Sequence, residues 1–317
     1  MTSRVHPELS ELVRLRFKAR GFSLLPKQPV SSLLSGRFAS RLRGRGLVFE
    51  ELRGYRPGDD IRTIDWKATA RLRSTQIRVY TEERERPVLL VTDQRTSMYF
   101  GSQRTTKATT AVELGALAAW RTLDVGDRVG ALVIGDQQLD EVRPQRSQRT
   151  VLRILHSFIE ANQRLGCEGA SRAATQSSNA LNAALKRAVH IAKHDYLVVL
   201  ITDFHGADEE TRRLATRLAS RNDVLACLVY DPLGISFPVS SPLRLTDGTN
   251  LRTILPDRNF EENFRRAFME RCTELRSILD AIRIPILPIC THEPVLDQVL
   301  YALGSSGPSS QRGKKQA

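Results

Sequence analysis

The chain has 317 residues, of which 41% are hydrophobic and 26% charged, as in a globular protein with one large core or two modest ones. Its longest apolar runs, 196–202 and 224–230, have only the length of strands, so no membrane-spanning helix is expected, and the N-terminus lacks the apolar stretch of a signal peptide. The four cysteines show no CxxC spacing, which argues against a zinc site and favours reduced thiols in a cytoplasmic protein.

The net charge of +13 is concentrated toward the N-terminus. Residues 1–86 contain 19 Lys and Arg against 10 Asp and Glu. Such a basic region can contact nucleic acid, an anionic membrane or an acidic protein, and it is equally compatible with a solvated surface. Residues 14–45 lack the interleaved aromatic side chains that stack on bases, so nucleic acid is not the favoured partner.

Residues 1–46 are predicted to form an N-terminal helix followed by a basic connector. Apolar residues recur at helical spacing over 7–20, whereas the remainder is rich in Gly, Ser, Pro and Arg. Residues 47–86 combine dense charge with scattered large apolar side chains, a Pro-Gly turn and an alternating strand at 76–80. This pattern predicts a small β-rich block.

Residues 87–302 alternate strand and helix patterns, and the tail at 303–317 has a disordered composition. Strands separated by helices form right-handed βαβ units, so we expect an α/β fold with a doubly wound, mostly parallel sheet. Helices are predicted at 107–123, 147–163, 180–193, 208–220, 258–281 and 295–302. Strands are predicted at 88–92, 128–134, 139–143, 196–201, 224–230 and 284–289, with a hairpin between 233 and 256.

Three of these strands end in an acid, namely Asp93, Asp203 and Asp231. The carboxyl ends of parallel strands share one edge of the sheet, so Asp93 and Asp203 are expected to converge there. With nearby hydroxyls they would offer the oxygen ligands that Mg²⁺ prefers. The alternative, which spacing alone favours, is that each acid caps the helix that follows its strand.

The residues at these strand ends resemble a known metal site. Asp93-x-Arg95-x-Ser97 after a buried strand, with Thr202-Asp203 after a later one, resembles the von Willebrand factor A domain. The metal-ion-dependent adhesion site of that family holds Mg²⁺ with Asp-x-Ser-x-Ser, a distant Thr and a distant Asp.

The stretch FEELRGYRPGDDIRTIDWKATAR, over residues 49–71, carries a more specific resemblance. It is similar to the signature of the DUF-58 family (domain of unknown function 58), which joins this block to a von Willebrand A-like domain. The resemblance implies a von Willebrand A-like fold for residues 87–302, preceded by a DUF-58 signature block at 47–86.

The metal motif departs from the family pattern. Only Asp93, Ser97 and Asp203 carry over directly as metal ligands. The first serine is Arg95 here, and a guanidinium has no lone pair for a cation and repels its charge. The distant threonine should lie near Asn179, which would supply an amide oxygen instead. We therefore expect a degenerate site without a metal cofactor, in which Arg95 pairs with Asp93 or Asp203 in place of Mg²⁺.

The charged residues of the signature block alternate in sign around a tryptophan. One interpretation is a partner-docking surface, because Trp beside Arg is typical of interface anchors. The other, which we favour, is an internal salt-bridge network with the tryptophan in a core, since its apolar neighbours also need burial. The residues concerned are Arg56, Asp59, Asp60, Arg62, Asp65, Trp66, Lys67 and Arg71.

Together these patterns predict a non-catalytic protein-interaction module that docks through the carboxyl edge of the sheet. The chain has no GxGxxG, GxxxxGK[ST], HExxH or GxSxG motif, so no enzyme is expected. The resemblance to DUF-58 implies an adaptor or co-chaperone that works with a MoxR-type AAA+ ATPase, and it allows an association with membrane proteins. The expected contact residues are Asp93, Arg95, Ser97, Asn179, Asp203 and His205.

Two alternatives from other functional classes stay open. The basic region at 14–45 would bind nucleic acid or anionic membranes, with a steep dependence on salt. A Mg²⁺-dependent hydrolase would use Asp93 and Asp203, and Asp203→Ala would then abolish turnover without loss of stability.

Overall fold

The computed structural model describes eight stretches of the chain, namely residues 5–24, 48–57, 59–81, 86–165, 177–235, 243–246, 251–254 and 258–304. The chain divides into two compact units, Arg41–Arg86 and a larger unit made of Met1–Ser40 and Pro87–Ala317. Most of the predicted basic connector, on which the nucleic-acid and membrane alternatives depend, lies outside the described residues. So does most of the predicted disordered tail.

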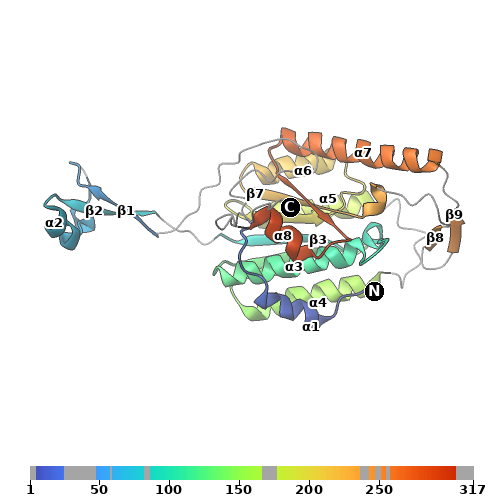
Figure 1. Ribbon diagram of the computed structural model, residues 1–317, viewed down its shortest axis with the longest axis horizontal. Coiled ribbons are helices and arrows are strands. Elements are labelled where there is room, and N and C mark those ends of the chain that lie inside the picture. The colour runs from blue at the N-terminus through green and yellow to red at the C-terminus, as the bar shows by residue number, and fades with distance from the viewer. Residues whose placement is uncertain are drawn as a thin grey trace, which may run out of the picture. The chain divides into compact units, whose positions relative to one another are not determined.

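The larger unit is built on a six-stranded sheet in the order β10-β7-β6-β3-β4-β5 (Figure 1). The first five of these strands are parallel, and β5 runs antiparallel to β4 at the edge. The predicted α/β fold with a doubly wound, mostly parallel sheet is confirmed. The strands are β3 (Val88–Asp93), β4 (Val129–Ile134), β5 (Leu139–Gln145), β6 (Leu197–Thr202), β7 (Asp223–Tyr230) and β10 (Ile286–Cys290).

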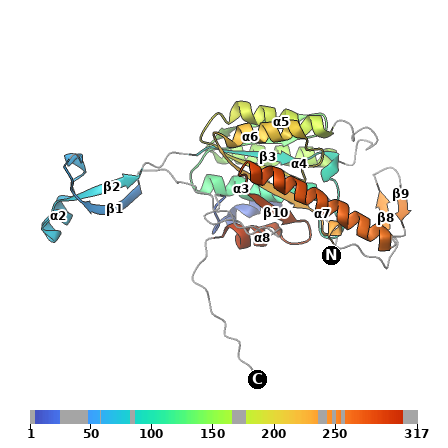
Figure 2. The same cartoon turned by 90° about the horizontal axis from the view of Figure 1, so that it is seen from above.

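Helices cover both faces of this sheet, as Figure 2 shows. The first face carries α1 (Leu9–Arg14), α3 (Lys107–Asp124), α4 (Gln148–Arg164) and α8 (Val295–Leu303). The second face carries α5 (Ser177–Ile191), α6 (Glu209–Ala219) and α7 (Arg258–Ala281). A sheet covered on both sides needs strands that are apolar on both sides, which explains their short, continuous apolar runs.

The central strand β3 shows how the sequence produces this arrangement. All six of its residues are buried. Leu90 packs among the helices of the first face, and Leu89 and Val91 pack among those of the second. Leu89 and Leu90 are 0% exposed, and burying each such side chain contributes about 1.5–3 kcal/mol. Asp93 therefore sits at the end of a strand that is clamped from both sides.

The N-terminal helix is part of the larger unit. Leu12 is buried, and its carbonyl accepts a hydrogen bond from Trp120 Nε1 of α3 at 2.9 Å. The helix predicted over 7–20 is shorter than expected, because α1 ends at Arg14 and a single 3₁₀ turn follows at Leu15–Phe17. Tighter 3₁₀ turns commonly close a helix in this way.

The larger unit also contains a β-hairpin and a close contact between two helices. Strands β8 (Leu243–Thr246) and β9 (Leu251–Ile254) pair antiparallel, which confirms the predicted hairpin. Helices α3 and α4 approach closely at Gly115, where a Cβ would lie only 2.8 Å from the ring of Phe158. Within the described ranges, no helix has both the length and the apolar character needed to cross a membrane.

The smaller unit contains two antiparallel strands and one short helix, as expected of a small β-rich block. Strand β1 (Val48–Gly54) pairs antiparallel with β2 (Gln76–Thr81), and α2 (Trp66–Leu72) lies between them in the chain. The acids of the signature hold this unit together. Asp65 Oδ1 accepts the N–H groups of the first turn of α2, and Asp60 caps the 3₁₀ turn Ile61–Thr63.

Of the expected salt-bridge network, one ion pair, Arg53–Asp59, is present among the described residues, and the acids otherwise accept backbone N–H groups. Asp59 accepts hydrogen bonds from Arg53 Nη2 at 2.8 Å and from the Arg56 N–H at 2.7 Å, which fixes the Pro-Gly turn. The N–H of Arg56, followed by the side chain of Arg53, outweighs the effect of burial and keeps the pKa of Asp59 below its ordinary value.

The expectation that Trp66 lies in a core is wrong. Trp66 is 71% exposed and Ile61 is 66% exposed, whereas Ile77 of β2 is buried. A two-stranded sheet with one short helix has too little inner surface to cover a tryptophan at the first position of that helix. The remaining signature cations, Arg56, Arg62, Lys67 and Arg71, also expose their side chains.

Candidate functional site

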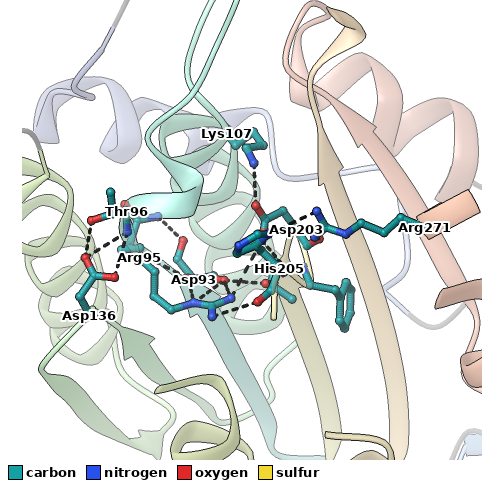
Figure 3. A network of polar contacts seen from close by, with 11 residues as sticks. Asp93, Arg95, Thr96, Lys107, Asp136, Asp203, His205 and Arg271 are labelled. Carbon is teal, nitrogen blue, oxygen red and sulfur yellow. Dashed lines mark hydrogen bonds and ion pairs between the residues drawn. The ribbon is translucent and has the colours of Figure 1, made fainter. Parts of the chain in front are cut away.

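Asp93 and Arg95 form a buried ion pair at the carboxyl end of β3 (Figure 3). Arg95 Nη2 lies 2.6 Å from Asp93 Oδ2, and Arg95 Nε lies 2.9 Å from Oδ1 and 3.1 Å from Oδ2. The Arg95 backbone N–H also donates to Asp93 Oδ1 at 3.0 Å. Both side chains are 0% exposed. The pairing of these two residues, expected from the sequence, is confirmed.

The neighbouring strand β6 supplies the groups that face this pair. Because β6 lies parallel to β3, the two carboxyl ends are adjacent. Thr202 Oγ1 donates to Asp93 Oδ2 at 2.6 Å, and Arg95 Nη1 donates to the carbonyl of His205 at 3.1 Å. Arg95 Nη2 lies 4.0 Å from Asp203 Oδ1. Asp93 and Asp203 thus converge at one sheet edge, as predicted.

Asp203 has a cation of its own. Lys107, the first residue of α3, places Nζ 2.6 Å from Asp203 Oδ2, and the N–H of His205 donates to Oδ1 at 2.8 Å. Arg271 of α7 donates to the backbone carbonyl of Asp203 at 2.9 Å and lies 3.4 Å from His205 Nδ1 (Figure 3). Helices α3 and α7 and strands β3 and β6 are joined through these contacts.

The turn after β6 depends on an uncommon backbone conformation. Phe204 adopts a left-handed conformation with φ 54°, and Gly206 follows with φ 74°. For a non-glycine residue this conformation costs roughly 1–2 kcal/mol. It is stabilised here by the hydrogen bond from the Phe204 N–H to Thr202 Oγ1, at 3.0 Å, and by burial of the Phe204 ring. The turn brings the carbonyl of His205 to Arg95.

The electrostatics of the site favour charged Arg95 and charged Asp203. Burial opposes the charge on Arg95, but Asp93, followed by Asp203 and Asp136, outweighs it and raises the pKa of Arg95. Burial likewise opposes ionisation of Asp203, but Lys107, the His205 N–H and Arg95 together lower the pKa of Asp203. Burial, helped by the nearby cations, lowers the pKa of His205, so this imidazole is held in its neutral form.

Hydrogen bonds of Thr96 and Gln94 fix the loop that follows β3. Asp136, just after β4, accepts hydrogen bonds from Thr96 Oγ1 at 2.5 Å and from the Thr96 N–H at 3.1 Å. The buried side chain of Gln94 donates to the carbonyl of Ala108 at 3.0 Å and accepts from Asn162 Nδ2 of α4 at 2.9 Å. These contacts leave the strand end little freedom to rearrange.

Other predicted site residues fall outside this network. Ser97 Oγ is buried and has no hydrogen-bond partner in the part of the chain that the structure describes. Asn179 lies in the first turn of α5 with an exposed side chain, and none of the described contacts joins it to Asp93 or Asp203. Asp231 accepts from Ser102 and Thr291 and caps a 3₁₀ turn, as the capping alternative predicted.

Sequence reasoning missed Lys107, Asp136 and Arg271 as members of the site. Asp136 and Arg271 carry no local signal, because their partners are distant in the sequence. Lys107 carries one, since a cation in the first turn of a helix opposes the helix dipole and indicates a nearby anion.

The residues at this strand end do not fit Mg²⁺. A magnesium ion needs oxygen ligands at 2.0–2.1 Å in octahedral geometry. Asp93 Oδ2 is already approached at 2.6 Å by both Arg95 Nη2 and Thr202 Oγ1, and a positive guanidinium stands where the ion would bind. The unused oxygen of Ser97 is too little to hold a cation against that charge.

A small open cavity lies beside the network, between the sheet edge and α7. Its volume is about 160 Å³. Lys107, Asp203 and Arg271 form its polar rim, and aromatic side chains, including Phe100 and Phe268, form its walls. Phe100 is 36% exposed and Arg271 is exposed, so this cavity can be reached from solvent.

Comparison with known proteins identifies relatives of this chain. A family model described as "Protein of unknown function DUF58" matches residues 51–278. Uncharacterized proteins Rv1480 of Mycobacterium tuberculosis and Mb1516 of Mycobacterium bovis are each 28% identical over 298 residues, which span 92% of this chain and 90% of theirs.

Two solved structures are also similar. The conserved hypothetical protein BatB from Bacteroides thetaiotaomicron matches with 15% identity and a TM-score of 0.37, over 68% of this chain and 95% of BatB. A von Willebrand factor type A protein from Catenulispora acidiphila matches with 13% identity and a TM-score of 0.24, over 59% of this chain and 43% of that one.

Proposed function

The chain belongs to the DUF58 family of proteins of unknown function, and from this premise we propose that it is a protein-interaction module that docks a partner at the carboxyl edge of its sheet. The observation that carries the proposal is the cavity of about 160 Å³ beside the Arg95 network. It combines aromatic walls with an arginine and a lysine at the rim. Aromatic residues and arginine are enriched where protein partners bind, whereas lysine is not.

The rigidity of the edge supports recognition. Arg95, Asp93 and Asp203 are paired and buried, so a partner would meet a preformed surface. Preorganisation lowers the entropy lost on association. In this proposal the guanidinium of Arg95 takes the place that Mg²⁺ has in an adhesion site and holds the acidic side chains of the strand ends in position, and no metal takes part.

The pairing also argues against catalysis at this edge. The Thr202 hydroxyl donates to Asp93, and Asp203 is bound by Lys107. The Nδ1 of His205 faces Arg271. Thr202 and Asp93 are 3% and 0% exposed, so this hydroxyl–carboxylate pair does not meet a substrate, as nucleophilic catalysis would require. We therefore include the absence of catalysis in the proposal.

We further propose that the partner is a MoxR-type AAA+ ATPase and that the chain acts as its adaptor or co-chaperone. The support for this step is the family membership and its signature block at 47–86. The cavity would receive an apolar side chain of the partner, while Arg271 and Lys107 would face its acidic residues.

The proposal is tested by measuring binding of the purified chain to the MoxR-type ATPase of the same organism by biolayer interferometry. Arg271→Glu should weaken binding at least about tenfold, because it places an anion at the rim beside Asp203. The matched control is Arg265→Glu, which makes the same charge change at an exposed position of α7 that does not line the cavity.

Equal affinities for wild type and Arg271→Glu would overturn the docking site, provided that both proteins melt at the same temperature. Equal weakening by Arg265→Glu would show that net charge, and not the cavity, governs binding. Absence of any binding by the wild type would overturn the choice of partner.

A further inference from the structure

A basic groove runs between α5 and α6, away from the Arg95 network. Figure 2 shows the two helices side by side on the second face of the sheet. The groove encloses about 600 Å³, within the range of small-molecule sites. Its cationic lining, together with two histidines, consists of Lys186, His190, Lys193, His194, Arg217 and Arg221.

The groove lies at the opposite edge of the sheet from the proposed docking site. Lys193 and His194 come just before β6, and Arg221 comes just before β7, so they mark the amino ends of these strands. Asp93 and Asp203 mark the carboxyl ends. The two sites therefore share no residue, and the groove is independent of the proposed function.

Most of the positive charge in the groove has no counter-charge among the described residues. Lys186 Nζ lies 3.4 Å from Glu210, and His194 Nδ1 lies 3.1 Å from Asp195. No acidic partner of Lys193, Arg217 or Arg221 is found among the residues that the structure describes. These three exposed cations come from two helix ends and face one space.

The frame of the groove is fixed by Asn222. Its Nδ2 donates to the carbonyls of Ala192 and Leu218, at 2.9 and 3.1 Å, and its Oδ1 accepts the N–H of Tyr196 at 3.0 Å. One side chain thus ties the ends of α5 and α6 to the start of β6. It also satisfies two carbonyls that would otherwise repel an anion at these helix C-termini.

A purely structural explanation of these cations is that they compensate the negative C-terminal ends of the dipoles of α5 and α6. That explanation accounts for His190 and Arg217, which lie in the last turns. It does not account for the hollow between the helices or for the apolar floor of Val189 and Leu214 beneath the charges. A floor of this kind suits an organic ring or chain.

We propose that this groove binds a small polyphosphate ester, with the phosphates among Lys193, Arg217 and Arg221 and the organic part on the apolar floor. Three cations around one space match the compact charge of a di- or triphosphate better than a single carboxylate. An acidic peptide or a nucleic acid would spread its charge over more surface than this groove provides.

Isothermal titration calorimetry of the full chain at physiological salt, without divalent metal, tests the proposal with inorganic triphosphate and with a nucleoside triphosphate. The double variant Lys193→Glu/Arg217→Glu should weaken both at least about tenfold, since two attractive charges become repulsive. The matched control, Arg149→Glu/Arg153→Glu on α4, reverses two exposed cations on the opposite face of the sheet. Thermal melts establish that each variant is folded, and Lys193→Gln/Arg217→Gln repeats the test without new anions.

Binding that falls with the groove variants and not with the control supports the proposal, and tighter binding of the nucleoside triphosphate supports the role of the floor. Equal binding of the two probes would overturn that role. No binding by the wild type, or equal loss in the control, would overturn the site. Tighter binding of an acidic peptide or an oligonucleotide than of either triphosphate, lost with the same variants, would overturn the ligand class.

Discussion

Arg95→Met tests the central feature of the site, the buried ion pair with Asp93. The substitution keeps a long apolar stem but removes the guanidinium. Asp93 then stays 0% exposed and retains only the Thr202 hydroxyl and one backbone N–H among the contacts described above. Breaking a buried pair by removing one partner costs about 3–5 kcal/mol, so the free energy of unfolding should fall by that amount.

The measurement is urea denaturation followed by tryptophan fluorescence. The chain has two tryptophans, and Trp120 is buried in the larger unit whereas Trp66 is exposed. In a Trp66→Phe background the signal therefore reports only the unit that contains Arg95. Asp93→Asn and the double variant Asp93→Asn/Arg95→Met complete a cycle, in which the double variant should be less destabilised than the two single effects combined.

A surface pair provides the control. Arg212 and Glu209 contact each other on α6 while 45% and 59% exposed, so Arg212→Met should destabilise the protein far less than Arg95→Met. If Arg95→Met costs no more than Arg212→Met, or if the cycle is additive, the ion pair does not organise the strand end and the reasoning about a substituted metal fails.

Three more predictions follow from the same geometry. Arg95→Ser restores the Asp-x-Ser-x-Ser spacing, so Mg²⁺ at ten times its dissociation constant should stabilise this variant by about 1.4 kcal/mol. The melting temperature of the wild type should not change with Mg²⁺. An equal response of both proteins to a chelator would contradict this prediction. Because the folded-state pKa of Asp203 is lowered, ionised Asp203 stabilises the protein above pH ~4, and this contribution is lost as the pH falls. The difference in unfolding free energy between wild type and Asp203→Asn should therefore narrow below pH ~4 when denaturation is measured as a function of pH. A difference that stays constant with pH would be contrary evidence. Gly115→Ala should lower the free energy of unfolding by about 1–3 kcal/mol, since its Cβ would lie 2.8 Å from the Phe158 ring. Gly54→Ala is the control in the same thermal melts, because a Cβ at that position meets nothing within 4 Å.

The sequence predicted the parts of the site that follow from local contacts or from the parallel sheet, whose strand ends bring Asp93 and Asp203 to one edge. Asp93 and Arg95 are two residues apart at the end of one strand, so their pairing could be anticipated from the chain alone. Lys107 and Arg271 reach Asp203 from 96 and 68 residues away, and no periodicity encodes such a distance. Asn179, assigned by its place in a family pattern, lies outside the network because that pattern does not specify where a changed side chain points.

The smaller unit shows the opposite error. Trp66 was expected in a core because large apolar side chains are usually buried, yet it is 71% exposed. Burial depends on whether other elements cover a position, and a two-stranded sheet with a seven-residue helix covers little. The acids of the same block form capping and turn contacts with backbone N–H groups two or three residues away, where the sequence interpretation expected salt bridges.

By itself the sequence determined the doubly wound sheet, because short apolar strands alternate with amphipathic helices and each period selects its element. It also determined that an arginine faces the acid at the end of β3. Only the tertiary structure decided which distant cations complete that site, and that residues 186–194 and 217–221 face each other across one groove. The reason is physical: backbone periodicity and capping act within a few residues, whereas charge networks and cavities arise where packed helices and strands bring remote side chains together.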